Sequence, residues 1–227
     1  IITDEGLNIL IDPFISNNPA CQIPVEEFNP DIILVTHGHS DHLGDAMELS
    51  NKNNVPVAAI HEISLFLSKQ GINNIGVNIG GSFIYRGVKF TMLDAKHSSV
   101  LDIVEEPLPA GDAASFLITL EDGTKLFHAG DTGLFGDMKT IIGEIYKPDI
   151  ALLPIGDKFT MGPFEAALAT RWIDPKVALP MHYNTFPPIE QDPSIYANFV
   201  SQLNPNIDVV ILNPGEYFEY NPENYQD

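Results

Sequence analysis

Cysteine and basic residues are the two scarce components of this 227-residue chain. Cys21 is its single cysteine, which excludes an internal disulfide and any metal site built from several thiolates. The chain has 11 Lys and Arg residues against 31 Asp and Glu residues, which gives a formal net charge of −20. Such a surface repels polyanions, and no cluster of basic side chains offsets it locally. We therefore expect no nucleic-acid partner, which argues against a nuclease.

Long apolar runs are also missing. The runs that exist are strand-sized, far shorter than a membrane span, and no charged-then-apolar signal segment opens the chain. Hydrophobic residues make up 44% of the sequence, which is ordinary for a soluble globular protein with a substantial core. No linker and no solenoid-type repeat divides the chain. We expect a cytoplasmic protein with a single domain over residues 1–227, no membrane partner and a small-molecule substrate; the oligomeric state stays open, a homo-oligomer included.

The most informative stretch is residues 36–42, which read Thr-His-Gly-His-Ser-Asp-His. The unbroken apolar run at 32–35 predicts a buried strand before it, and the apolar spacing of 43–49 predicts a helix after it. Open α/β sheets place their ligand sites on such loops, at the carboxyl ends of strands. In locally extended backbone the side chains at 37, 39 and 41 would alternate onto one side, with His42 pointing elsewhere. One loop could then serve two neighbouring metal ions, and imidazole and carboxylate suit zinc and similar divalent ions.

Two further histidines also come just past expected strands. His97 follows the strand expected at 88–93, and His182 follows the strand expected at 177–179. Taken alone, His97 is equally well a metal ligand or a surface residue. His61, by contrast, opens an expected helix with no other ligand chemistry near it in sequence, so we expect a surface or helix-start histidine there.

A hairpin is predicted at 113–129, because Asp122-Gly123 separates two apolar runs. Its second strand leads to Asp131, which could cap its own turn. His128 precedes Asp131 by three residues. It could be a buried histidine, a group that orients a metal ligand, or a proton donor to the leaving group, in that order of preference.

These segments together resemble the metallo-β-lactamase superfamily, whose signature is Thr-His-x-His-x-Asp-His after a hydrophobic strand. The later segments are more similar still to uncharacterised metal-dependent hydrolases related to L-ascorbate-6-phosphate lactonases. The segments that carry this closer resemblance are residues 96–99, 128–135, 153–157, 159–163 and 180–186. The resemblance covers nearly the whole chain in order, and it implies an α/β fold: an αββα sandwich with two mixed β-sheets packed face to face and helices outside.

The resemblance also implies a dinuclear site with two divalent metal ions. One ion would be held by His37, His39 and His97, the other by Asp41, His42 and His182, and both by Asp131 as a bridging carboxylate. Zinc is the expected metal, with manganese, nickel and iron as alternatives. Two ions roughly 3.5–4 Å apart lower the pKa of water toward neutrality, so the bridging hydroxide becomes the nucleophile and no Ser or Cys is needed. The residues expected to act in the reaction are Asp41, which would aim the hydroxide, with Asp131 and His128.

By analogy, the expected activity is metal-dependent hydrolysis of a small phosphodiester or lactone. Two alternatives stay open. A non-hydrolytic metal-binding protein would have a closed coordination shell, and a redox di-iron protein would usually carry Glu at the position of His39. Asp157-Lys158 departs from the Asp-Asn common among such relatives, which bears on the substrate. Relatives also usually open with a strand that carries Gly-His-Ser, so we expect the first strand of the fold to precede Ile1.

Overall fold

Phe116 and Leu117 mark the point where the packing of the chain changes from one compact unit to another. The structure is a computed structural model and describes residues 1–225. Its first unit runs from Ile1 to Phe116, and its second begins at Leu117. The strand β9 (Ala114–Thr119) crosses this division. The single domain expected over residues 1–227 stays a prediction.

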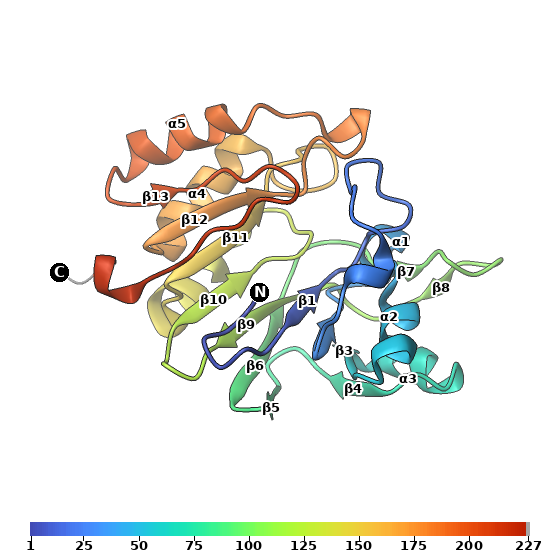
Figure 1. Ribbon diagram of the computed structural model, residues 1–227. Helices are drawn as coiled ribbons and strands as arrows, with labels where there is room; N and C mark the ends of the chain where they lie inside the picture. Colours follow the sequence, from blue (N-terminus) through green and yellow to red (C-terminus); the bar gives the residue numbers. More distant parts are fainter. Residues whose placement is uncertain (226–227) are drawn as a thin grey trace. The chain divides into compact units, whose positions relative to one another are not determined.

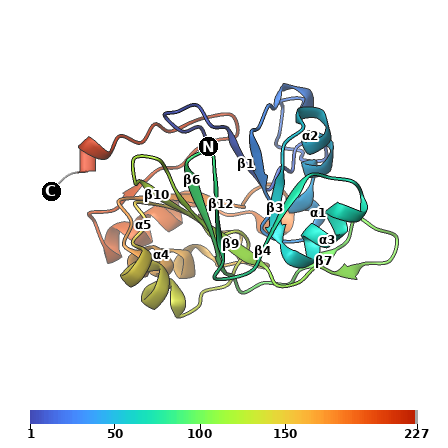
Figure 2. The ribbon, with the colours of Figure 1, turned by 90° about the horizontal axis from the view of Figure 1, so that it is seen from below.

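The two central strands of the sheet in the first unit are built from wholly apolar runs. The strands of this sheet, in spatial order, are β1 (Ile9–Ile11), β2 (Ile32–Leu34), β3 (Val57–Ile60) and β4 (Asn74–Val77). The three neighbouring pairs are parallel, and an isolated antiparallel bridge joins Ile2 to Asn8. The residues of β2 and β3 are buried throughout, as expected for strands covered on both faces. The helices α2 (Ala46–Asn53) and α3 (His61–Lys69) lie along one face of this sheet (Figures 1 and 2).

Two antiparallel pairs complete the first unit. The hairpin of β5 (Ser82–Tyr85) and β6 (Val88–Asp94) turns where the sequence has Arg86-Gly87. The second pair is the short antiparallel ladder of β7 (Val100–Leu101) and β8 (Leu108–Pro109). A short helical turn, η1 (Val25–Glu27), lies in the loop after β1.

The metal-ligand loop differs from its prediction after His39. Residues 40–43 form a helical turn, α1 (Ser40–Leu43), so the extended backbone expected as far as Asp41 is wrong for Asp41. The reason is that the His39 carbonyl accepts hydrogen bonds from the N–H groups of His42 and Leu43, at 3.0 and 2.9 Å. The helix expected at 43–49 is interrupted at Gly44, whose φ of 42° is left-handed, and resumes as α2.

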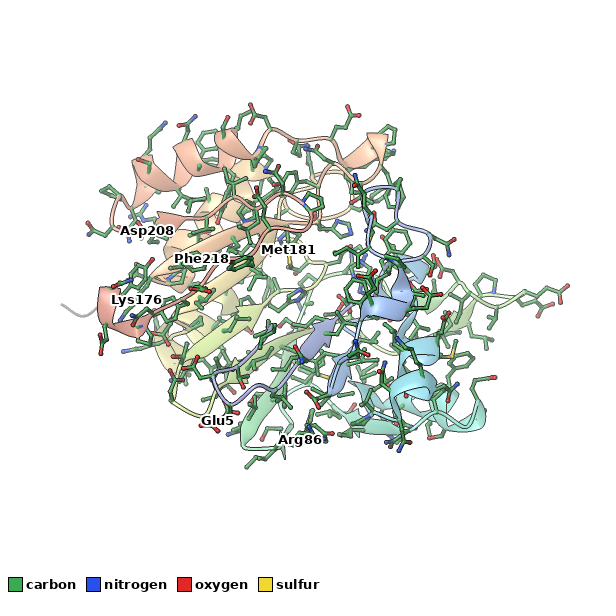
Figure 3. All side chains as sticks on the ribbon, in the orientation of Figure 1. Glu5, Arg86, Lys176, Met181, Asp208 and Phe218 are labelled. Carbon is green, nitrogen blue, oxygen red and sulfur yellow. The ribbon has the colours of Figure 1, made fainter. Side chains whose placement is uncertain are left out.

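The second unit contains a row of parallel strands. In spatial order they are β10 (Lys125–His128), β11 (Ile150–Pro154), β12 (Val177–Met181) and β13 (Asp208–Val209). The connecting helices are η2 (Met138–Tyr146), α4 (Pro163–Ile173) and α5 (Pro193–Leu203), with the short turns η3 (Pro187–Ile189) and η4 (Pro222–Tyr225). Figure 3 labels Lys176 and Asp208 where β12 and β13 begin, and Met181 where β12 ends. The carboxyl ends of these strands therefore lie on the Met181 side of the sheet.

The C-terminal segment of the second unit follows the sheet face opposite α4 (Figures 1 and 2). The Lys176 ammonium group donates a hydrogen bond to the Tyr225 carbonyl at 2.9 Å, which fastens the end of the segment. None of the helices in residues 1–225 is both long enough and apolar enough to cross a membrane.

Candidate metal centre

Three histidines converge in the first unit. His37 and His39 stand on the loop after β2, and His97 follows β6. One ring nitrogen from each of the three lies within 4.8 Å of the others, and His37 Nε2 is 2.8 Å from His39 Nδ1. The His97 ring centroid lies 5.0 Å from that of His37 and 5.2 Å from that of His39. The structure thus brings together the three residues predicted to hold one metal, and His61 is exposed at the start of α3 as predicted.

Two glycines let the ligand loop pass close to its neighbours. A Cβ on Gly38 would lie 2.7 Å from both the Ala110 Cβ and the Val100 carbonyl oxygen, so only glycine fits there. A Cβ on Gly44 would meet the Pro13 carbonyl oxygen at 2.3 Å. The Gly38 N–H also donates to the Ser99 hydroxyl at 3.2 Å, which ties the loop to the residue two positions after His97. The histidines therefore stand on backbone that is clamped from both sides.

Asp12, which directly follows β1, determines which ring nitrogens of His42 and His37 carry a proton. Its carboxylate accepts hydrogen bonds from the Thr36 N–H at 2.8 Å and the Thr36 hydroxyl at 2.7 Å, and it lies 2.8 Å from His42 Nδ1. A carboxylate only accepts, so His42 Nδ1 carries the proton and Nε2 of the neutral ring is left to bind a metal. The single hydroxyl proton of Thr36 goes to Asp12, so Thr36 Oγ1 accepts from His37 Nδ1, 3.0 Å away.

Asp12 is thus a hydrogen-bond acceptor for both Thr36 and His42. Sequence reasoning included Thr36 and Ser99 in the motifs but gave neither residue a role of its own. Their positions next to His37 and close after His97 were the only available signal.

Asp41 and His42 stand together on α1. The His42 Nε2 atom is 3.8 Å from Asp41 Oδ2, and the His42 ring centroid is 4.0 Å from that of His37. Asp41 is partly exposed, whereas His42 is buried. The segment 37–42 therefore presents two imidazoles of the triad, His37 and His39, and directly beside them a carboxylate–imidazole pair.

The second unit carries a carboxylate–imidazole pair of its own. Asp131 follows β10 and His182 follows β12, and His182 Nε2 lies 3.3 Å from Asp131 Oδ2. Asp131 is buried, and the His182 backbone takes a left-handed φ of 54°. The neighbouring Tyr183 hydroxyl has a raised pKa because of its burial, so it keeps its proton at neutral pH. Parallel strands thus bring two predicted ligands together that are 51 positions apart in sequence.

His128 supports the turn that carries Asp131. Its Nδ1 accepts a hydrogen bond from the Gly130 N–H at 3.2 Å, and its side chain is buried. Because Nδ1 is the acceptor, the proton of the neutral ring is on Nε2. This contact fits the orienting role considered from the sequence and leaves Nε2–H as the only proton that the neutral ring could donate.

A family comparison identifies the chain. Residues 7–183 match the family model described as the beta-lactamase superfamily domain. The chain belongs to this superfamily. The metallo-β-lactamase type of α/β fold predicted from the sequence is thereby confirmed.

Named relatives agree with this family. The chain is 99% identical to a UPF0173 metal-dependent hydrolase of Methanobrevibacter smithii, over all of the chain and 95% of that protein. It is 55% identical to the one of Methanosphaera stadtmanae, over 95% of the chain and 93% of that protein. The solved structure of Igni18, a metallo hydrolase from Ignicoccus hospitalis, superposes with a TM-score of 0.86 at 38% identity, covering 96% of this chain and 94% of that one. The chain is thus a member of a family of metal-dependent hydrolases, and the finer link to ascorbate-6-phosphate lactonases stays a prediction.

Proposed function

We propose that this chain hydrolyses a small molecule, a phosphodiester or a lactone, and that its two groups of ligands hold two divalent metal ions. His37, His39 and His97 would serve one ion and Asp41, His42 and His182 the other, with Asp131 shared. The observation that carries the proposal is the imidazole triad: three ring nitrogens lie within 4.8 Å of one another, and two of them, from His37 and His39, stand on a clamped loop. Such a nitrogen and carboxylate donor set suits zinc and similar divalent ions.

When bound, two such ions lower the pKa of a water molecule toward neutrality and polarise a carbonyl or phosphoryl oxygen. The residues of the chain supply the rest. Asp12 fixes the proton on Nδ1 of His42 and, through Thr36, on Nδ1 of His37, so that both rings present Nε2. Asp41 is partly exposed, and its carboxylate can accept a hydrogen bond from the attacking water and aim it. His128 carries its neutral-state proton on Nε2, the position from which a leaving group would be protonated.

The net charge of −20 supports a small substrate over RNA, because a polyanion would be repelled from such a surface. A non-hydrolytic metal protein is the second candidate. His39 supports hydrolysis over redox chemistry, because redox di-iron proteins of this fold would usually carry Glu at this position. The His39 ring takes part in the imidazole triad, with Nδ1 2.8 Å from His37 Nε2.

The test is hydrolysis of bis(p-nitrophenyl) phosphate by protein reconstituted with zinc or manganese, with a chelated sample as the control. Turnover that appears only with metal would support a hydrolytic site and direct the search toward phosphodiesters. Absence of turnover against this probe and against simple lactones, with two metals per chain demonstrated by elemental analysis, would contradict hydrolysis and favour the non-hydrolytic alternative.

A further inference from the structure

One loop between the predicted ligands of the second unit has no role in the proposed chemistry. Asp131 follows β10 and His182 follows β12, and the strand between them, β11, leads into residues 155–162. Loops at the carboxyl ends of neighbouring parallel strands meet at the same edge of the sheet, where α/β proteins bind their ligands. Residues 155–162 therefore stand where a substrate would approach Asp131 and His182.

This loop is fastened to both of its neighbours. The Met161 N–H donates to the Thr132 carbonyl at 3.0 Å, next to Asp131. On the other side, a Cβ on Gly156 would lie 2.5 Å from the His182 carbonyl oxygen, so the two backbones are in close contact.

The tip of the loop is closed by two bonds of its own. The Asp157 N–H donates to the Met161 carbonyl at 3.0 Å, and the Thr160 N–H donates to the Asp157 carbonyl at 2.7 Å. The tip residues between these bonds are thus held in a fixed relation to the backbone that carries both ligands.

Lys158 and Phe159 form that tip. The Lys158 ammonium nitrogen lies 5.4 Å from the centre of the Phe159 ring, within the range of a cation–π contact, and Phe159 is 54% exposed. No hydrogen bond or ion pair joins Lys158 to another of residues 1–225. By contrast, Lys125 and Lys176, where β10 and β12 begin, donate to the carbonyls of Tyr146 and Tyr225.

The charges on the loops at this edge of the sheet indicate what Lys158 could bind. Lys158 is the single Lys or Arg in the loops that follow β10, β11 and β12, residues 129–137, 155–162 and 182–192, in a chain with a net charge of −20. The acidic surface of the chain opposes the approach of a negatively charged small molecule, and a cation on one of these loops would favour it locally. Lys158 is available for that role, because its ammonium group is bonded to no carboxylate or carbonyl in the described part of the chain, residues 1–225.

We propose that Lys158 and Phe159 recognise an anionic group of the substrate, a phosphate or a carboxylate, that lies outside the bond that is cleaved. This inference rests on the proposed hydrolysis. The Lys158 ammonium pairs with the anion. The Phe159 ring positions the lysine and offers an apolar face to the adjoining part of the substrate. The pair makes this hydrolase selective for substrates that carry an anionic group outside the cleaved bond over substrates that lack one.

The test compares two esters with the same leaving group, neutral p-nitrophenyl acetate and mono-p-nitrophenyl succinate, which carries a remote carboxylate. Lys158→Gln is expected to raise KM for the succinate about 3- to 10-fold, as a charge-assisted hydrogen bond is lost. KM for the acetate and kcat for both esters should not change. Lys158→Arg should keep the KM for the succinate close to that of the unmodified protein. Lys139→Gln is the matched control, because Lys139 is an exposed lysine on η2. An equal change for both esters, or no change, would overturn the proposal.

Binding of phenyl phosphate and of succinate, measured by calorimetry on the metal-loaded protein, separates this proposal from the proposed hydrolysis. Loss of binding in Lys158→Gln supports anion recognition even if no ester is hydrolysed, and the anion that shows the larger loss identifies phosphate or carboxylate. Binding of both anions that is the same in Lys158→Gln and in the unmodified protein would overturn recognition by Lys158, whether or not turnover is seen.

Discussion

His42 Nδ1 lies 2.8 Å from Asp12 Oδ2, and the same carboxylate oxygen accepts a hydrogen bond from the Thr36 hydroxyl at an O–O distance of 2.7 Å. Through these two contacts one carboxylate sets the proton positions of two imidazoles, His42 directly and His37 through Thr36. In the proposed site these two rings serve different metal ions. Asp12 is therefore the group whose loss should disturb both ions at once.

Asp12→Asn is expected to weaken metal binding by about 10- to 100-fold, the usual effect of losing a group that orients a ligand. Asparagine tolerates the left-handed φ of 47° at this position, so the substitution should not strain the backbone. The new amide N–H₂ would donate a hydrogen bond to His42 Nδ1, which donates one to Asp12 in the unmodified protein. This favours the tautomer with the proton on Nε2, and a protonated Nε2 cannot bind a metal. Competition with a chromogenic chelator measures the affinity. Asp45→Asn is the control, because Asp45 also accepts two hydrogen bonds, from the N–H groups of Ile15 and Ser16; equal losses in both variants would contradict the role of Asp12.

Asp131→Ala is expected to remove metal and hydrolytic activity together, because the shared carboxylate would be lost from both ions. Elemental analysis of the purified variant gives the metal content per chain. Asp149→Asn is a matched control, since the Asp149 carboxylate accepts the Lys125 N–H at 2.9 Å where β10 begins. Two metals per chain in Asp131→Ala would rule out the ligand assignment.

Gly38→Ala should destabilise the protein by about 1–3 kcal/mol, the usual cost of overpacking. The new Cβ would be 2.7 Å from the Ala110 Cβ and the Val100 carbonyl oxygen, so the ligand loop or β7 has to shift. Urea unfolding of the metal-free protein measures the change without the metal contribution. Gly136→Ala, where a Cβ meets no atom within 4 Å, should be close to neutral. Similar unfolding midpoints for the two variants would show that the loop is not clamped.

His128 can be tested by two isosteric replacements. Asparagine places an oxygen near the position of Nδ1 and can still accept the Gly130 N–H, whereas glutamine places its polar group near Nε2. If His128 acts by holding the turn before Asp131, His128→Asn should keep metal content and activity close to the unmodified values, and His128→Gln should lower both. If activity falls in both variants while metal content stays intact, the proton-donor role is the correct one.

Tyr196 should make the protein sensitive to alkali. Its hydroxyl is buried between α5 and α4, 2.6 Å from the Thr170 hydroxyl, and burial raises the pKa of Tyr196 above its ordinary value. At neutral pH both the folded and the unfolded states keep this proton. Above about pH 10 the unfolded chain loses it and the folded protein keeps it, so stability falls as pH rises.

Melting temperatures at neutral pH and at about pH 10.5 provide the measurement. Tyr196→Phe should cost about 1 kcal/mol at neutral pH, through the lost hydrogen bond, and should show a smaller fall in melting temperature at the higher pH. Tyr217→Phe, at a position 80% exposed, is the control. An unchanged alkaline fall in Tyr196→Phe would show that other groups cause it.

The sequence by itself determined the ligand types and the strands that present them. The apolar run at 32–35 is long enough to be a buried strand, and the spacing of His37 and His39 after it puts both rings on one loop. The end of each strand also marked His97, Asp131 and His182 correctly as residues of strand-end loops. Periodicity and turn residues act over a few positions, which is why these local features could be read.

Only the tertiary structure decided which groups orient those ligands. Asp12 meets Thr36 and His42 across 24 and 30 positions, and such contacts depend on the pairing of β1 with β2 rather than on any local pattern. The helical turn of α1 was hidden for a similar reason: Gly44 closes it against the Pro13 backbone, a contact between segments distant in sequence. The placement of the 155–162 loop at the sheet edge that also carries Asp131 and His182 likewise follows from the order of the parallel strands. Neighbours in a parallel sheet are joined by crossovers, so their ends meet only once the sheet is formed.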